Sequence, residues 1–214
     1  MEMKTKKRGL FAVLSIVALF AMTEYSVSIA ATSSVEAVAN KIEASKNKKN
    51  ADGELLLAAV KAQRVETVKS LIQGGVDVNS VVEGDGTALI LATKAGDVKM
   101  VDELIKLGAN VNLHSYGDGN PLIAAAKTGN LDIVKKLITA GAKVNTIVQG
   151  DETPLINAAR AGEAEVVKYL VANGADVNLG SVERSNGRDQ LRTPLNQASN
   201  GDIKQFLKSK GAKQ

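Results

Sequence analysis

One stretch decides the fold: residues 150–178 read GDETPLINAARAGEAEVVKYLVANGADVN. After an opening turn, Thr153 stands where a helix N-cap is expected, and Pro154 takes the first helical position, where its missing N–H does no harm. Apolar residues at helical spacing follow in two short runs, the first ended by Gly162 and the second by Gly174. The stretch therefore predicts a helix-turn-helix unit.

This unit recurs along the chain with a period of 33 residues. A fixed period of this length is typical of a solenoid, in which a helix pair buries its apolar face only against stacked neighbours. The small alanines allow close contact between helices. The recurring residues are the Val-Asn pairs at 78–79, 111–112, 144–145 and 177–178, the glycines Gly75, Gly108, Gly141 and Gly174, the leucines Leu56, Leu89, Leu122 and Leu155, and the alanines Ala59, Ala92, Ala125 and Ala158.

The composition fits such an array and argues against most catalytic centres. The 214 residues include no Cys, no Trp, three Tyr, three Phe and one His. Disulfides and cysteine-based zinc sites are thereby excluded. The single histidine, His114, rules out mechanisms that need two. We therefore expect a core of Ala, Leu, Val and Ile, with no catalytic residue, no cofactor and no metal site.

Residues 1–30 have the pattern of a secretory signal peptide. Four basic residues precede an uncharged stretch over residues 9–22, and the small residues Ser28 and Ala30 stand before an expected cleavage site at Ala31. The uncharged stretch is shorter than the roughly 20 residues that span a bilayer. An uncleaved N-terminal anchor is the alternative. Both interpretations predict export, to the periplasm or the medium. After cleavage we expect no part of the mature chain to be inserted in a membrane.

Residues 31–51 are expected to form a polar leader or linker. The whole chain carries a net charge of +4, and residues 1–30 hold four basic and two acidic side chains, which leaves +2 for the mature chain. Because this charge is small and the leader has no aromatic residues for stacking, we expect no nucleic-acid partner. We expect the protein to be a monomer.

The repeated unit resembles the ankyrin repeat. The family's Thr-Pro-Leu opening is present at 153–155, as Asn-Pro-Leu at 120–122 and as Thr-Ala-Leu at 87–89, and Gly-Ala-Asp-Val-Asn is complete at 174–178. The resemblance implies an all-α fold, an ankyrin-repeat solenoid of about five helix-turn-helix units with β-turn fingers. This domain is expected over residues 52–213, with units that start near residues 52, 85, 118, 151 and 191.

The sequence departs from the family pattern in several ways. The first unit has Gln63 where later units have glycine, and the last is shorter and rich in lysine, as terminal caps are. The family commonly has histidine after Thr-Pro-Leu, where it braces the turn. Here isoleucine stands at that position, so we expect the fingers to be braced in another way. A polar insertion at 179–192, which contains Arg184 and Arg188, is expected on the finger side, which such arrays often use for binding.

The resemblance implies a non-catalytic module that binds a protein partner through a concave face of fingers and first helices. Basic residues recur in register in four first helices, and aspartates recur in the preceding turns. At a helix spacing of about 8–10 Å each set is expected to form a column, one basic and one acidic. Such columns either select a partner of complementary charge or are merely solvated. The residues are Lys61, Lys94, Lys127 and Arg160, and Asp85, Asp118 and Asp151.

Tyr116 is the predicted binding anchor. Of the three aromatic residues outside the signal peptide, Tyr169 and Phe206 lie in second helices, where we expect them to pack. Tyr116 lies instead at a finger tip beside His114, with no apolar periodicity around it. Exposed tyrosines are favoured anchors in protein interfaces. Simple solvent exposure without a binding role is the alternative.

These observations together predict an exported adaptor or regulator of the bacterial cell envelope. A secreted effector that binds proteins of another organism is the alternative. An enzyme is a remote one, because the recurring carboxylates belong to different repeats on an open surface. Residues 117–126 are similar to ankyrin segments of bacterial envelope zinc metallopeptidases of the penicillin-sensor type, which points to an envelope or membrane protein as the partner.

Overall fold

The computed structural model describes residues 48–148, 152–185 and 188–213, with the side chains of 183–188 left out. The chain divides into two units, Met1–Lys46 and Asn47–Gln214, and the second is described below. The predicted signal peptide and most of the predicted leader lie outside the described residues. Residues 48–51 of that leader belong to the first described helix, which runs to residue 61.

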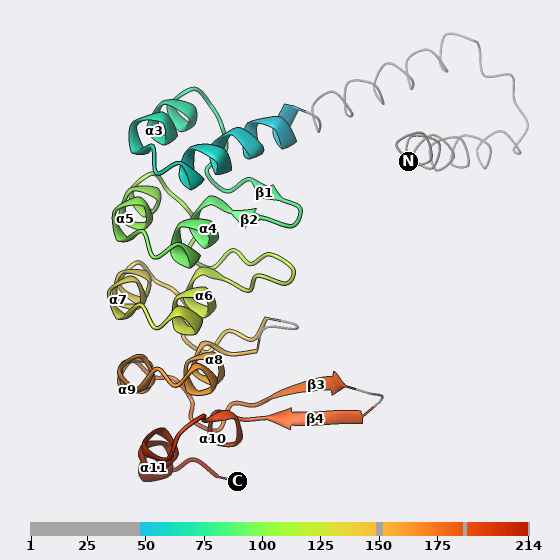
Figure 1. The fold of residues 1–214 in the computed structure, drawn as a ribbon, viewed down its shortest axis with the longest axis vertical. Helices are drawn as coiled ribbons and strands as arrows, with labels where there is room; N and C mark the ends of the chain where they lie inside the picture. Colours follow the sequence, from blue (N-terminus) through green and yellow to red (C-terminus); the bar gives the residue numbers. More distant parts are fainter. Residues whose placement is uncertain (1–47, 149–151, 186–187, 214) are drawn as a thin grey trace, which may run out of the picture. The chain divides into compact units, whose positions relative to one another are not determined.

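The described residues of the second unit form five helix pairs stacked in chain order (Figure 1). First helices contact first helices of neighbouring pairs, and second helices contact second helices, so the stack has two layers. The predicted all-α solenoid is thus confirmed. The pairs are 48–61 with α3 (Val65–Gln73), α4 (Ala88–Lys94) with α5 (Val98–Lys106), α6 (Pro121–Thr128) with α7 (Leu131–Thr139), α8 (Pro154–Ala161) with α9 (Ala164–Ala172), and α10 (Pro194–Gln197) with α11 (Gly201–Ser209).

The first helices begin with the capping chemistry that the sequence predicts. Four N-cap side chains accept a hydrogen bond from the backbone N–H three residues later, at 2.9–3.2 Å. Such caps satisfy backbone donors that have no partner inside the helix. The cap residues are Thr87, Asn120, Thr153 and Thr193.

The core follows the predicted periodicity. The recurring leucines and alanines of the first helices are buried, and they pack against valine, isoleucine, leucine and methionine of the second helices. The isoleucines that replace the family's histidine are also fully buried, so they fill the interior and do not brace a turn by hydrogen bonding. These residues are Ile90, Ile123 and Ile156.

The asparagine of each Val-Asn pair joins one unit to the next. Asn112 donates from Nδ2 to the carbonyl oxygen of Gly141 at 3.1 Å and accepts from the backbone N–H of Lys143 at 2.8 Å. Asn79, Asn145 and Asn178 make the same two bonds with the units that follow them. The recurrence of this asparagine thus has a structural cause.

The turns between helix pairs form four hairpin fingers on one side of the stack (Figure 1). In the first finger β1 (Val81–Val82) pairs with β2 (Gly86–Thr87). The second and third close with single bridges, Ser115 to Gly119 and Val148 to Glu152. The predicted insertion folds into the fourth, in which β3 (Ser181–Ser185) pairs antiparallel with β4 (Arg188–Arg192). We call this longer finger, residues 181–192, the hairpin arm.

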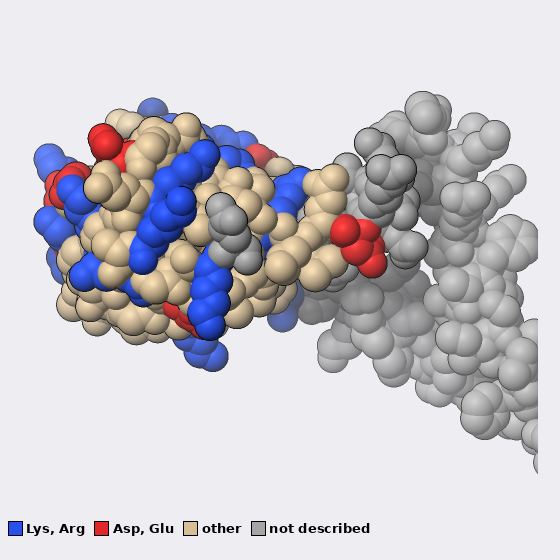
Figure 2. Space-filling view, turned by 90° about the horizontal axis from the view of Figure 1, so that it is seen from below, with Lys and Arg blue, Asp and Glu red and all other residues tan. Residues whose placement is uncertain are grey.

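The last described pair has a shortened first helix and a basic outer face. When α11 and α9 are aligned by their N-caps, Lys204 stands at the position of Val167 and Lys208 at that of Val171. Val167 is buried, whereas both lysines are exposed. Figure 2 shows Lys and Arg spread over this end of the stack. Lysine at positions that elsewhere contact the next unit gives the stack a solvated face here, as expected for a cap.

Candidate functional site

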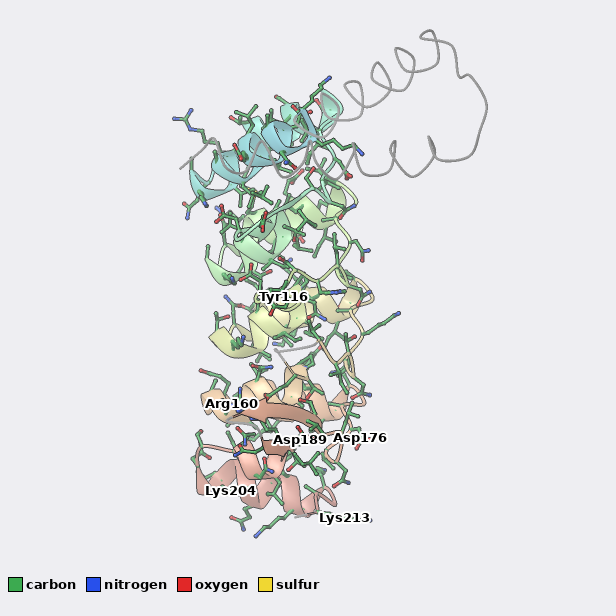
Figure 3. The ribbon with its side chains drawn as sticks, turned by 90° about the vertical axis from the view of Figure 1, so that its right-hand side faces the viewer. Tyr116, Arg160, Asp176, Asp189, Lys204 and Lys213 are labelled. Carbon is green, nitrogen blue, oxygen red and sulfur yellow. The ribbon has the colours of Figure 1, made fainter. Side chains whose placement is uncertain are left out.

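The exposed apolar side chains lie mainly on the fingers. Tyr116 is 94% exposed at the tip of the second finger, which Figure 3 views from the finger side. Large apolar side chains exposed to water are favoured contact residues when they gather on one surface. Among the described residues one other, Leu55 on the first helix, is similarly exposed. The exposed apolar finger residues are Val81, Tyr116, Ile147, Val182 and Leu191.

Four of the finger residues form a row. Val81, His114 and Ile147 occupy the same position in successive fingers and are exposed. At the next interval the chain has Gly180, and a Cβ built there would lie 2.8 Å from Leu191 Cδ1. Leu191 therefore lies over the place of the missing side chain and completes the row on the hairpin arm. We call Val81, His114, Ile147 and Leu191 the finger row.

The predicted basic and acidic columns pair with each other across the fingers. Lys61 Nζ lies 3.0 Å from Asp85 Oδ1, and Lys94 forms an ion pair with Asp118. In both cases the carboxylate stands 24 residues after the lysine, in the turn before the next helix pair. At these residues the two predicted columns therefore lie side by side and pair with each other, and a binding role for them stays a prediction.

These ion pairs supply the bracing that the sequence left open. Each joins a first helix to the following finger, and the Asp118 carboxylate also lies close to the second-last residue of the first finger. A Cβ on Gly86 would be 2.9 Å from Asp118 Oδ2, and Gly86 has a φ of 77°. Exposed ion pairs contribute about 0–1 kcal/mol each. The pairs thus orient the fingers more than they stabilise the fold.

For the remaining predicted site residues, the structure describes only part of their position or contacts. Lys127 also interacts with another group, so it is not a free cation. Asp151 lies outside the described residues. Arg184 and Arg188 lie in β3 and β4, and their side chains are not among those described. A binding role for each of these residues stays a prediction.

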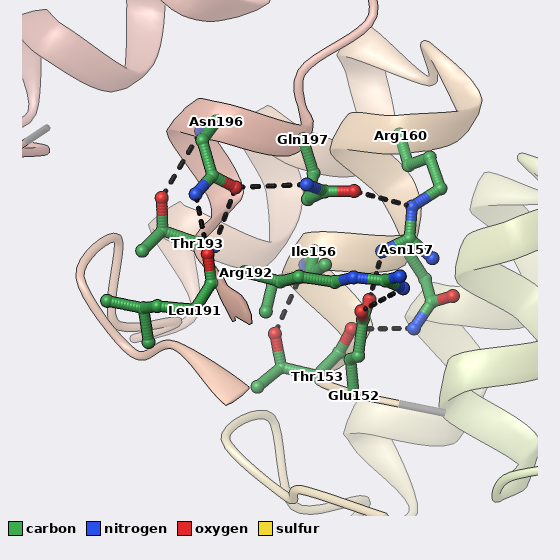
Figure 4. Close-up of polar contacts among 10 residues, drawn as sticks. All are labelled: Glu152, Thr153, Ile156, Asn157, Arg160, Leu191, Arg192, Thr193, Asn196 and Gln197. Carbon is green, nitrogen blue, oxygen red and sulfur yellow. Dashed lines mark hydrogen bonds and ion pairs between the residues drawn. The ribbon is translucent and has the colours of Figure 1, made fainter. Parts of the chain in front are cut away.

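Arg160 departs from the pattern of the lysines and binds a buried carboxylate. Glu152, at the base of the third finger, has a side chain only 4% exposed. It accepts from Arg160 Nη2 through one carboxylate oxygen and from Arg192 Nη1 through the other, the latter at 2.9 Å (Figure 4). Arg160 also donates from Nε to Gln197 Oε1 at 3.1 Å. Sequence reasoning missed Glu152, although it stands where the first two fingers have glycine.

A second group of charges lies on the second helices, away from the fingers. Asp102 on α5 accepts from Lys106 at 2.7 Å and from Lys136 of α7 at 2.8 Å. Hydrogen bonds from Lys106 and then Lys136 lower the pKa of the Asp102 carboxyl to about 2. On α3, a hydrogen bond to Glu66 raises the pKa of Lys69. Of these contacts, the one between Lys136 and Asp102 links neighbouring second helices.

In the described part of the chain, no group of three or more His, Asp or Glu side chains is gathered so that it could hold a metal ion. No described helix is both long enough and apolar enough to cross a membrane.

Comparison with known proteins identifies the repeat. A family model described as ankyrin repeats (3 copies) matches residues 27–115, 55–148 and 122–214, which together make up most of the chain. The search of curated proteins found no match.

Proposed function

Because the chain belongs to the ankyrin repeat family, whose repeats indicate protein–protein interaction and are generally non-catalytic, we propose that it is an adaptor or regulator of the bacterial cell envelope. Its fingers would bind a protein partner. The observation that carries this proposal is the location of the exposed apolar side chains, five of which lie on fingers.

The finger surface has the composition of a protein-binding site. Interface hot spots are enriched in tyrosine, and their energy comes from apolar area removed from water. Tyr116 supplies the largest such side chain, and Val81, Ile147 and Leu191 of the finger row extend the apolar surface along the stack. The ion pairs of Lys61 with Asp85 and of Lys94 with Asp118 lie on the first two fingers and are partly exposed. Such pairs suit a polar rim, which sets orientation and association rate.

The proposed location depends on the sequence pattern of residues 1–30. A basic segment, an uncharged stretch and small residues before Ala31 support export. Fractionation of the native host, with detection of the untagged protein, tests the location. Recovery in the periplasm or envelope supports an adaptor, recovery in the medium supports the secreted effector, and recovery in the cytoplasm contradicts export.

The binding site is tested by crosslinking, capture from envelope extract and mass spectrometry, with wild type and variants compared at equal loading. Tyr116→Ala is expected to lower recovery of the specific partner by at least about tenfold, as loss of a hot spot does. The matched control is Leu55→Ala, which removes an exposed apolar side chain from a helix. Equal recovery with Tyr116→Ala and with wild type would contradict binding through the fingers.

A further inference from the structure

Glu152 has a backbone conformation that usually requires glycine. Its φ is 62°, and the residues at the same position of the first two fingers are Gly86 and Gly119, with φ of 77° and 68°. A side chain in this left-handed region costs free energy, because Cβ crowds the neighbouring carbonyl oxygen. Such a conformation persists where surrounding contacts over-determine it. We therefore ask which contacts of the Glu152 side chain hold its backbone in this conformation.

Those contacts join three parts of the molecule. Glu152 itself belongs to the third finger, Arg160 to α8, and Arg192 is the last residue of β4 in the hairpin arm. The buried carboxylate gives one oxygen to each guanidinium (Figure 4). Charge-assisted hydrogen bonds are stronger than neutral ones, and the exclusion of water strengthens them further. A single side chain thus ties the base of the arm to a helix and a finger.

A chain of amide side chains supports the same base from α10. Gln197 accepts from Arg160 Nε and donates to Asn196 Oδ1, at 3.1 Å in both bonds. Asn196 Nδ2 donates to the carbonyl oxygen of Leu191 at 2.9 Å. Leu191 belongs to the finger row, so this network ends at a residue of the proposed contact surface.

The first two fingers are held in a different way. In the first two, the cation of the first helix pairs with an aspartate 24 residues later. Both aspartates stand two residues before the N-cap of the next first helix, and in the hairpin arm that position is Leu191, which offers Arg160 no carboxylate. The insertion therefore removes the ordinary ion pair, and Glu152 provides an anion from the preceding finger.

We infer that Glu152 is a positioning residue, whose buried carboxylate fixes the direction of the hairpin arm relative to α8 and the third finger. The arm then presents Val182 and Leu191 beside the other fingers before any partner binds. Such preorganisation saves the cost of ordering a segment on binding. The inference rests on the proposed function only in treating the arm as part of the contact surface, and its test needs no partner.

The test uses spin labels and pulsed electron-electron distance measurements on the full chain. Because the sequence has no Cys, the changes Gln190→Cys on the arm and Lys135→Cys on α7 give two unique labelling sites. Wild type is expected to give one narrow distance distribution. Glu152→Gly restores the residue of the first two fingers and removes the carboxylate, and is expected to widen the distribution roughly twofold or more, as motion of a freed hairpin would.

Arg192→Gln supplies an independent variant that leaves the third finger unchanged, so it carries the test if Glu152→Gly folds poorly. It should also widen the distribution. The matched control is Glu165→Gln, which removes an exposed carboxylate 2.7 Å from Lys168 and should leave the distribution as in wild type. Distributions as narrow as wild type in both Glu152→Gly and Arg192→Gln would overturn the inference. This result would not contradict the proposal that the fingers bind a partner, which partner capture tests separately.

Discussion

The second finger and the hairpin arm are held to the helices in different ways. The second finger is short, closes with a single bridge and is tied by the Lys94–Asp118 pair, in which the side chains are 44% and 13% exposed. The arm has strands of five residues and is tied by a carboxylate that two arginines enclose. The tip of a long hairpin moves further than that of a short one for the same change at its base. We therefore expect the arm to need a stronger contact at its base than a short finger does. The buried contact at Glu152 answers that need.

The largest expected effect comes from removing each carboxylate in turn. Glu152→Ala should lower the free energy of unfolding by about 2 kcal/mol, because two charge-assisted hydrogen bonds are lost and two arginines lose their anion. Asp118→Ala should lower it by about 0.5 kcal/mol, because Asp118 has one cationic partner, whose side chain is 44% exposed. Urea unfolding of both variants measures the difference. Equal losses would show that the two junctions do not differ in kind.

A smaller effect comes from Gln63 and Glu152, the two non-glycine residues with a left-handed backbone in the described part of the chain. Gln63 has a φ of 54°, and its side chain is exposed. Gln63→Gly should raise the free energy of unfolding by about 1 kcal/mol, since it relieves strain that no buried contact offsets. Glu152→Gly relieves similar strain but loses the carboxylate, so it should not stabilise. Thermal melts of the two variants, compared with wild type, measure these changes in stability. If Glu152→Gly raises the melting temperature, the carboxylate contributes little to stability.

The Lys94–Asp118 pair should contribute still less. Lys94→Glu is expected to lower the free energy of unfolding by about 0.5 kcal/mol, and the double exchange Lys94→Glu with Asp118→Lys should recover most of this loss. The coupling should shrink in 1 M salt, where exposed charges are screened. A double-mutant cycle at two salt concentrations measures it. Coupling that salt does not change would indicate a pair better shielded than its exposed lysine implies.

The smallest expected effect concerns charges outside the fingers. The pKa of Asp102 is about 2 in the folded chain against an ordinary 3.8, so the unfolded chain binds its proton first as pH falls. Its contribution to stability is complete above the ordinary pKa and is lost as pH falls through about 2. The difference in urea midpoint between wild type and Asp102→Asn should therefore narrow between pH 5 and pH 2. A constant difference would contradict a titrating ion pair.

The sequence was sufficient for the parts of the fold that repeat. The 33-residue period predicts the helix pairs, and Thr153 and Pro154 mark a helix start because capping is local chemistry. Pairing between Lys94 and Asp118 could not be derived in this way, since it depends on where the next finger lies relative to the helix. The contact of Glu152 with Arg192 joins residues 40 positions apart through the fold of an insertion.

Some missed features of the candidate site did leave a signal. Glu152 stands at a position that is glycine in the first two fingers, Gly86 and Gly119. A charged residue at such a position indicates that its side chain makes a specific contact. Val81 and Ile147 share a register, and a valine follows each of them, so the sequence marks an apolar pair in both turns but not which member is exposed. Burial and ion pairing of the cluster, by contrast, became evident only from the folded chain.

The bonds of Asn178 show how this architecture can acquire new specificity. Its partners, Gly211 and Lys213, stand 33 and 35 residues onward, whereas those of Asn112 stand 29 and 31 residues onward. The same junction therefore forms although the intervening chain has changed length. Evolution can lengthen or replace the loop between two helix pairs without disturbing the helices on either side. A surface for a new partner can thus be added at the tip of a finger while the folding information of the chain is inherited intact.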